Sequence, residues 1–283
     1  MRRFTVITIT YNAEAVLPRT LDSVLCQTYE GVEHLIIDGA STDGTLAMAE
    51  AYKRQSDEMG KGHKVIIRSE PDNGIYDAMN KGLTQASGDY IVYMNAGDCF
   101  PQPDTLEQIA HRCSLTATPS AELPGVLYGN TDIVDGEGHY LHPRRLQPPD
   151  RLTWRSFRQG MLVCHQAFYA RTDIAKNLQY DTRYKYSADV DWCIRVMRET
   201  ERMGLALYNI NMVVANYTEE GATTRHHRES LRERYRVMAS HYGQVSTFLM
   251  HLWFVLRNVA PRKTKKKLKK VLIIQILFVY LQN

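Results

Sequence analysis

Residues 33–45 read EHLIIDGASTDGT, an apolar run that ends at Asp38 and is followed by a turn. The apolar run predicts a buried strand over residues 33–38. Residues 41–44 hold turn formers and a helix N-cap, so we expect a helix over residues 45 to about 55. This strand, turn and helix set the interpretation of the segments on either side.

The alternation of strand and helix continues in both directions from this unit. Apolar, β-branched runs predict strands, and apolar residues at helical spacing predict helices. The expected strands are residues 4–10, 64–68 and 90–94, and the expected helices are residues 13–28 and 75–86. This order predicts an α/β fold with a mainly parallel sheet and helices on both faces.

Beyond about residue 120 the pattern is less regular. Strand-like runs are expected at residues 126–128, 161–169, 205–210 and 213–217, and a helix at residues 188–203. The organisation that we expect is one domain over residues 1–220 and a helical extension over residues 221–283.

Polar side chains follow several of the expected strands. In parallel α/β sheets, ligands bind beyond the carboxyl ends of the strands. Four segments fall there, namely residues 11–12, 38–39, 70–74 and 95–98. Their placement predicts that Asp38, Asp72 and Asp98 surround one cleft.

Composition and charge exclude several classes of protein. Five cysteines without a CxxC pair argue against a disulfide framework and a zinc site, and favour a reduced, cytosolic setting. No apolar stretch with a cleavage site follows the N-terminal residues, so we expect no signal peptide. The formal net charge is +4, but residues 257–283 hold eight Lys or Arg and no acid. The remaining chain is net acidic, which argues against nucleic-acid binding by the main domain.

Four passages share their order and spacing with a known family. They are residues 8–12, 35–45, 72–82 and 88–98. Together they resemble the family-2 glycosyltransferases with the GT-A (nucleotide-diphospho-sugar transferase) fold, over roughly residues 4–220. The resemblance is closest to bacterial colanic-acid-type and other surface-polysaccharide transferases. It implies inverting transfer of a sugar from a nucleotide diphosphate, typically UDP, to a hydroxyl of a saccharide or lipid-linked saccharide.

Such a transfer needs a hard cation to neutralise the departing diphosphate. Asp98 is the expected ligand of Mn²⁺ or Mg²⁺. The family usually has an Asp-x-Asp pattern here, whereas this chain has Asn95-Ala96-Gly97-Asp98, so only one carboxylate remains. Asn95 can add a neutral oxygen. The alternative for Asp98 is that it only caps a turn.

The resemblance implies that the first part of the chain binds the donor, with Asp38 on the base or ribose. The expected donor-binding residues are Thr10, Tyr11, Asn12, Asp38, Asp72, Gly74, Asp77, Asn95 and Ala96. The alternatives are turn formation for Asp38 and favourable placement at a helix N-terminus for Asp77. Lys81 is expected to be a solvated helix residue.

The resemblance also implies a general base at the start of the helix expected at residues 188–203. Asp189 corresponds to the base and Asp191 to its neighbour, and the alternative is that both are first-turn acids of a helix. Acids two positions apart do not share a helical face, so at most one of them faces the cleft. His165 and Gln166 are expected on the acceptor or phosphate side, although His165 could also be a satisfied core histidine.

The last residues combine charge with apolar character. A basic run at residues 262–270 precedes an apolar run at residues 271–281, which is too short to span a bilayer as a helix. Shallow binding to anionic lipid fits this pattern, with the protein at the inner face of the bacterial cytoplasmic membrane. The alternative is packing on the domain or on a second copy of the chain, as in a homodimer.

The sequence disfavours two other enzyme classes and leaves one non-enzyme class open. A sugar nucleotidyltransferase would need a glycine-rich, arginine-containing loop after the first strand, and a dinucleotide oxidoreductase would need GxGxxG there. The chain has Thr10-Tyr11-Asn12-Ala13 instead. A non-catalytic nucleotide-sugar-binding or scaffold protein of a polysaccharide assembly complex stays open as the alternative function.

Overall fold

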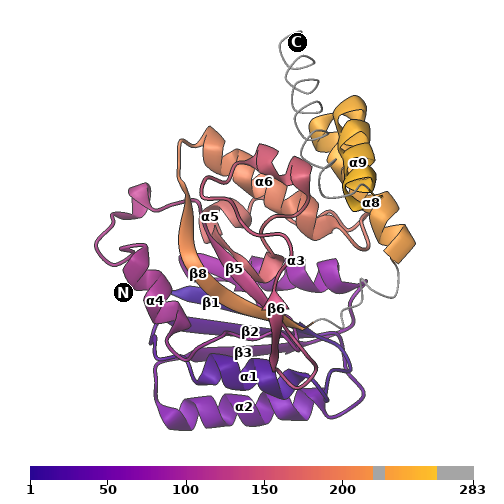
Figure 1. Ribbon diagram of the computed structural model, residues 1–283. Coiled ribbons are helices and arrows are strands. Elements are labelled where there is room, and N and C mark those ends of the chain that lie inside the picture. The colour runs from indigo at the N-terminus through magenta and orange to yellow at the C-terminus, as the bar shows by residue number, and fades with distance from the viewer. Residues whose placement is uncertain (219–226, 260–283) are drawn as a thin grey trace.

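The computed structural model describes residues 1–218 and 227–259, and its first half is a regular alternation of strands and helices (Figure 1). The strands of this half are β1 (Phe4–Thr10), β2 (Val32–Asp38), β3 (Lys64–Ser69) and β4 (Tyr90–Tyr93). The helices between them are α1 (Leu17–Leu25), α2 (Thr45–Met59) and α3 (Ile75–Gln85). Each of these strands and helices was expected from the sequence.

The second half is less regular. Its strands are β5 (Val126–Val134), β6 (Tyr140–Pro143), β7 (Phe168–Arg171) and β8 (Leu207–Thr218). Its α-helices are α4 (Thr105–Arg112), α5 (Thr172–Ala175), α6 (Ala188–Arg202), α8 (His227–Tyr242) and α9 (Gln244–Val259). Short 3-10 helices lie at Ser120–Glu122, Trp154–Gln159 and His165–Ala167.

All the strands join in one sheet of order β3-β2-β1-β4-β7-β5-β6, with β8 paired to β5. The four strands of the first half run parallel, and β8 is parallel to β5, whereas β7 is antiparallel to both β4 and β5. The expected α/β fold with a mainly parallel sheet is confirmed. The carboxyl ends of β1, β2, β3 and β4 therefore meet at one edge, where ligands bind in such sheets.

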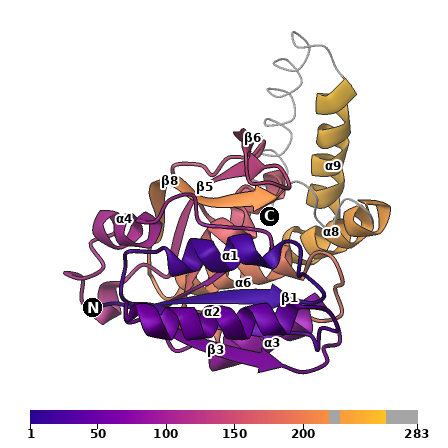
Figure 2. The same ribbon diagram turned by 90° about the horizontal axis from the view of Figure 1, so that it is seen from below.

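Helices cover both faces of the sheet, as Figure 2 shows from below. Alternate side chains of β2 explain the two layers, because successive residues of a strand point to opposite faces. Ile36 packs in the smaller core with α1 and α2, whereas Leu35 and Ile37 pack in the larger core with α3 and α6. Both α8 and α9 lie beyond α6, away from the sheet (Figure 1).

The approach of α3 to the sheet depends on a glycine. A Cβ on Gly82 would lie 2.6 Å from Ile7 Cγ2 in β1, far inside van der Waals contact. The small side chain therefore lets α3 lie close against β1. This places the first turn of α3, which follows Gly74, beside the carboxyl ends of the strands.

Several expectations for the second half are wrong in detail. Residues 161–169 are not one strand, because a 3-10 turn at His165–Ala167 precedes the short β7. The side chains of His165 and Gln166 in this turn are buried and hydrogen-bonded to distant residues. These bonds hold a turn at a place where the apolar pattern predicted a strand. The strands expected at residues 205–210 and 213–217 are the single strand β8, which is irregular near Asn211 with its φ of 56°.

The helical extension is observed in part as α8 and α9. The basic run at residues 262–270 and the apolar run at residues 271–281 lie outside the described residues. Within the described part of the chain, no helix combines the length and apolar character that crossing a bilayer requires.

Candidate active site

A cleft of about 760 Å³ opens at the carboxyl ends of the parallel strands. It is built from the ends of β1 and β2, the turn before α3 and the turn after β4. Its lining residues are Ile9, Thr10, Tyr11, Ala13, Gly39, Pro71, Asp72, Gly74, Ile75, Ala78, Asn95 and Ala96. Six of the residues expected to bind the donor are among them: Thr10, Tyr11, Asp72, Gly74, Asn95 and Ala96.

Two polar atoms in this lining have no hydrogen-bond partner among the residues that the structure describes. The hydroxyl of Thr10 and the Oδ1 atom of Asn95 are both buried without a hydrogen bond. Buried polar atoms are normally paired, so such atoms in a cleft point to a polar ligand or water. Tyr11 lies at the same cleft with 65 % of its surface exposed, which leaves its ring open to stacking.

The carboxylate of Asp72 is held by the side chain of Lys81, which was not expected to be part of the site. Lys81 Nζ lies 2.6 Å from Asp72 Oδ1 and 3.1 Å from Glu70 Oε1, and it donates to the Pro71 carbonyl at 2.8 Å. Lys81 is therefore not the solvated residue that was expected, because three neighbouring groups hold it against the cleft wall. The sequence feature that could have indicated an acidic partner is that Lys81 lies four residues after Asp77 on a helix, since residues at that spacing are neighbours.

The remaining residues expected to bind the donor lie beside the cleft and organise its loops. Asp38 is fully buried and accepts hydrogen bonds from the Ser41 amide and hydroxyl and, at 2.6 Å, from the Ser69 hydroxyl. Asn12 Oδ1 accepts from the Thr42 amide at 2.8 Å.

Asp77 lies in the first turn of α3 and accepts from the Asn73 amide at 2.9 Å. This contact is typical of an acid at a helix N-terminus. Contact of Asp38, Asn12 or Asp77 with a donor stays a prediction.

Asp98 lies in the turn after β4, and only 5 % of its surface is exposed. Its Oδ2 accepts from Gln166 Nε2 at 2.6 Å and its Oδ1 from the Thr218 amide at 3.2 Å. Burial raises the pKa of Asp98 to about 7, against the opposing hydrogen bonds and the charge of Arg19. This turn thus ties the end of β4 to the end of β8.

The residues of this turn fit a hard divalent cation by the chemistry of their donor atoms. Asp98 offers a carboxylate whose partners are both neutral, and Asn95 offers an unpaired amide oxygen. Mg²⁺ is commonly held by one or two protein oxygens together with water and phosphate. No cluster of three or more His, Cys, Asp or Glu residues arranged for a metal is found within residues 1–218 and 227–259.

The two residues expected on the acceptor or phosphate side are buried in the protein. His165 Nε2 lies 2.7 Å from the Tyr180 hydroxyl, and its ring stacks on Tyr93 with centroids 4.9 Å apart. Burial lowers the pKa of His165 to about 4, so the ring is neutral at physiological pH. Gln166 fixes Asp98 from the side of β7. Direct contact of either residue with a substrate stays a prediction.

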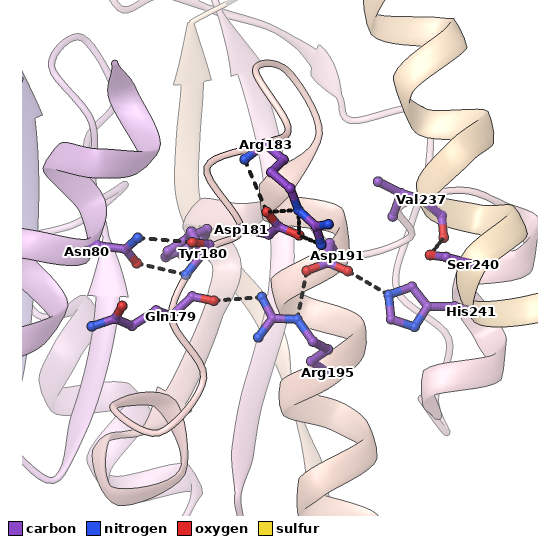
Figure 3. Close-up of polar contacts among 10 residues, drawn as sticks. All are labelled: Asn80, Gln179, Tyr180, Asp181, Arg183, Asp191, Arg195, Val237, Ser240 and His241. Atoms are coloured by element: carbon purple, nitrogen blue, oxygen red, sulfur yellow. Dashed lines mark hydrogen bonds and ion pairs between the residues drawn. The ribbon is translucent and has the colours of Figure 1, made fainter. Parts of the chain in front are cut away.

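The two acids at the start of α6 have different surroundings. Asp189 is half-buried and accepts a hydrogen bond from the Tyr76 hydroxyl at 3.2 Å. Asp191 is buried, and its two oxygens lie 2.7 Å from Arg195 Nε and from His241 Nε2 (Figure 3). Burial alone would raise the pKa of Asp191, but the contacts with His241 and Arg195 hold it below the ordinary value. Both oxygens of Asp191 are thus occupied within the protein, and Asp189 has the freer carboxylate.

Asp98 and Asp189 are 91 positions apart in the sequence, and the charges of both act on one hydroxyl in β8. Burial raises the pKa of the Tyr217 hydroxyl to about 12, and the negative charges of both Asp98 and Asp189 add to this rise. One hydroxyl in β8 is therefore near enough to feel both carboxylates. Tyr76, which bonds Asp189, follows Ile75 of the cleft lining in the chain.

Sequence comparison finds relatives that are described as glycosyltransferases. A PGL/p-HBAD biosynthesis glycosyltransferase from Mycobacterium bovis (strain BCG / Pasteur 1173P2) is 32% identical over 219 residues, which are 77% of either chain. The amylovoran biosynthesis glycosyltransferase AmsB from Erwinia amylovora is 27% identical over 224 residues, which are 76% of this chain and 69% of AmsB.

A solved structure shares the fold at low sequence identity. Glucosyl-3-phosphoglycerate synthase from Mycobacterium tuberculosis, in complex with Mn²⁺, uridine-diphosphate and glucosyl-3-phosphoglycerate, has a TM-score of 0.53 and 17% identity. The alignment covers 84% of this chain and 79% of that one.

The model of the family described as glycosyl transferase family 2 matches residues 5–178. With more than half of its length matched, the chain belongs to glycosyl transferase family 2 and is a glycosyltransferase with the GT-A fold.

Proposed function

We propose that this glycosyltransferase moves a hexose from a UDP-sugar, with inversion, to a hydroxyl of a saccharide or lipid-linked saccharide during bacterial cell-surface polysaccharide synthesis. The donor proposal draws on the UDP in the M. tuberculosis synthase complex. The pathway proposal draws on AmsB, which is described as an amylovoran biosynthesis enzyme.

The observation that carries the proposal is the position of Asp189 relative to the cleft. Tyr76 donates to Asp189 at 3.2 Å, and the neighbouring Ile75 lines the cleft. Asp189 is half-buried and does not belong to the lining, but its hydrogen-bond partner is adjacent in the chain to a lining residue, which supports a position next to the donor. This arrangement suits a base that receives the acceptor on one side of the donor sugar.

In the proposed step, Asp189 takes the proton of the acceptor hydroxyl as the acceptor oxygen attacks the anomeric carbon. The bond between that carbon and the diphosphate oxygen breaks, and its electron pair leaves with UDP. Attack opposite to the leaving group inverts the configuration. General-base assistance of this kind contributes about 10²–10⁴-fold to rate.

Thr10, Tyr11, Asp72, Gly74, Asn95 and Ala96 are proposed to bind the donor, because they line the cleft. Tyr11 would stack on the base, and the buried hydroxyl of Thr10 would gain the partner that it lacks in the protein. Asp98 and Asn95 would hold Mn²⁺ or Mg²⁺. When bound, that cation would neutralise the charge that develops on the diphosphate.

The cell-surface proposal includes the location of the enzyme. We propose peripheral contact with the inner face of the cytoplasmic membrane through the basic and apolar tail, because basic residues beside a short apolar segment favour anionic lipid. A lipid-linked acceptor would be reached there. Packing of the tail on a second copy of the chain is the alternative, and analytical ultracentrifugation with and without liposomes of anionic lipid separates the two.

A panel of UDP-glucose, UDP-galactose and UDP-GlcNAc, each with Mn²⁺, Mg²⁺ or EDTA, tests the proposal. The donor should raise the melting temperature in the presence of the cation, because ligand binding to the folded state stabilises it. The same donor should release UDP slowly by hydrolysis. A non-catalytic binding or scaffold protein would show the shift in melting temperature with no UDP release above background.

A further inference from the structure

Helix α8 holds the segment that leads into α6. The carboxylate of Glu233 on α8 accepts hydrogen bonds from three consecutive backbone amides, those of Lys185, Tyr186 and Ser187, at 2.8, 2.6 and 2.7 Å. Three amides on one carboxylate fix both the position and the direction of the chain as it enters the helix. We call this set of contacts the Glu233 clamp.

The clamp lies directly before the first turn of α6. Ser187 is the N-cap residue of α6, but its side chain makes no capping hydrogen bond. The N-terminal end of a helix attracts negative charge, because its amides are unpaired and its dipole is positive there. Glu233 on α8 brings a carboxylate to this end, where it accepts from the amide of Ser187 and from the amides of the two residues before it, so the chain that enters α6 is held by a residue 46 positions beyond Ser187.

A second contact joins the two helices one turn further along α6. His241 on α8 donates from Nε2 to Asp191 Oδ1 at 2.7 Å, and both side chains are only 8 % exposed. Arg195 occupies the other oxygen of Asp191 and also donates to the Gln179 carbonyl at 2.7 Å (Figure 3). Asp191 thereby links α6, α8 and the loop before α6.

Asp189 lies between these two contacts, two residues after the clamped Ser187 and two residues before Asp191. Among the described residues, Tyr76 alone donates a hydrogen bond to its carboxylate, so the position of Asp189 depends on how the start of α6 is held. Burial raises the pKa of the Tyr76 hydroxyl well above its ordinary value, and the charges of Asp189 and Glu233 both add to this rise. The clamp and the proposed base are thus close to the same hydroxyl.

We propose that Glu233 and His241 are positioning residues for Asp189, so that α8 is part of the catalytic unit of this enzyme. The inference rests on the proposed function, in which Asp189 is the base. Both residues lie beyond residues 5–178, the part that matches the family model. Displacing a reacting group by about 1 Å can lower a rate by about 10²-fold, so a helix start that is loosened by a distant residue is enough to slow transfer.

The test compares Glu233→Ala, Glu233→Gln and His241→Leu with Glu229→Ala, an exposed acid of the same helix that serves as the matched control. UDP release from the panel of UDP-sugars with Mn²⁺ gives kcat, and calorimetry with UDP and Mn²⁺ gives the donor affinity. Glu233→Ala should lower kcat by about tenfold or more while the Kd for UDP stays within about threefold. Glu233→Gln should lie between wild type and Glu233→Ala, since its amide oxygen can still accept from the clamped amides.

Two further readouts separate positioning from a general loss of stability. Hydrogen exchange of the Lys185, Tyr186 and Ser187 amides should rise in Glu233→Ala and stay unchanged in Glu229→Ala. In an Asp189→Asn background, Glu233→Ala should cause no further fall in kcat, because residues that act through one group are not additive. A further fall of the full tenfold, or an unchanged kcat together with faster amide exchange, would overturn the inference and leave the proposed function standing. Absence of UDP release in the wild-type protein would instead contradict the proposed function itself.

Discussion

The two halves of the site are held together in different ways. The donor side is built on four parallel strands whose backbone pairing brings their carboxyl ends together, and short loops carry the cleft residues. The catalytic side depends on side-chain bonds between distant segments, such as Glu233 to the Ser187 amide and His241 to Asp191. Backbone pairing sets the donor side, whereas a few buried polar contacts set the position of the proposed base.

This difference predicts different responses to substitution. On the donor side, single changes should alter the binding of UDP, because the strands keep the cleft in place. On the catalytic side, single changes should alter turnover or stability, because side-chain contacts such as His241 to Asp191 hold α8 against α6. The predictions below test this contrast, from the largest expected effect to the smallest.

Asp189→Asn tests the catalytic side at its centre. An amide of the same shape cannot take a proton from the acceptor, so turnover should fall by about 10²–10⁴-fold. The donor cleft does not include Asp189, so the Kd for UDP with Mn²⁺ should stay within a few-fold. Steady-state UDP release and calorimetry measure the two quantities. Retained turnover with weakened UDP binding would move Asp189 to the donor side.

Asp191→Asn tests the buried contact beside the base. The change leaves His241 and Arg195 without their carboxylate, and breaking a buried ion pair of this kind costs about 3 kcal/mol of unfolding free energy. Urea denaturation measures the loss. Asp57→Asn on α2 is the control, because its partner Lys53 is also four residues away but the two side chains are 43 % and 57 % exposed. That exposed pair should contribute less than about 1 kcal/mol.

Sequence reasoning identified most of the donor side and only part of the catalytic side. The strand ends and turns of residues 33–45 and 88–98 carry local signals, so the cleft and six of its lining residues were predicted. Asp189 was predicted as the base from the family resemblance, and this role stays a prediction. Glu233 and His241 were missed, because each lies on a mainly polar helix and acts only through a partner at least 46 positions away.

The errors have the same origin. Lys81 was taken for a solvated residue because a lysine on a helix usually faces water, whereas here the turn after β3 brings Glu70, Asp72 and the Pro71 carbonyl to it. Residues 161–169 were taken for a strand because apolar spacing does not show that His165 and Gln166 are bonded to distant side chains. Local patterns predict elements, but contacts between elements decide which polar residues build a site.

Two buried histidines allow the halves to be compared by pH. Burial lowers the pKa of His34, on β2, to about 3 and that of His165, on the catalytic side, to about 4. In the unfolded chain each ring takes up a proton below about pH 6.5, so the unfolded state binds more protons as pH falls. Each neutral ring therefore makes its full contribution to stability above that pH. The contribution is lost as the pH falls toward the pKa of the ring in the folded protein.

Between pH 6.5 and 5, each histidine should therefore account for about 2 kcal/mol of lost unfolding free energy. Urea denaturation at a series of pH values measures the slope, and His34→Gln or His165→Gln should each make it shallower by a similar amount. Below about pH 4, only the variant at position 34 should still differ in slope from wild type. A slope that neither substitution changes would mean that both rings take up protons in the folded state.

Gly39→Ala tests the donor wall with the smallest expected effect. A Cβ on Gly39 would lie 2.9 Å from Asp72 Oδ2 and 3.2 Å from Tyr11 Cδ2, and both side chains line the cleft. Asp72 cannot move away freely, because Lys81 holds its other oxygen, so the displacement should pass to the open ring of Tyr11. The Kd for UDP with Mn²⁺ should rise between about threefold and tenfold, which is up to about 1.4 kcal/mol, with turnover of bound donor nearly unchanged.

Gly136→Ala is the control, since a Cβ there meets no atom within 4 Å. Equal UDP affinities in the two variants would show that the nucleotide does not bind against this wall, whereas a loss of turnover in Gly39→Ala would show that the donor and catalytic sides are less independent than their construction indicates.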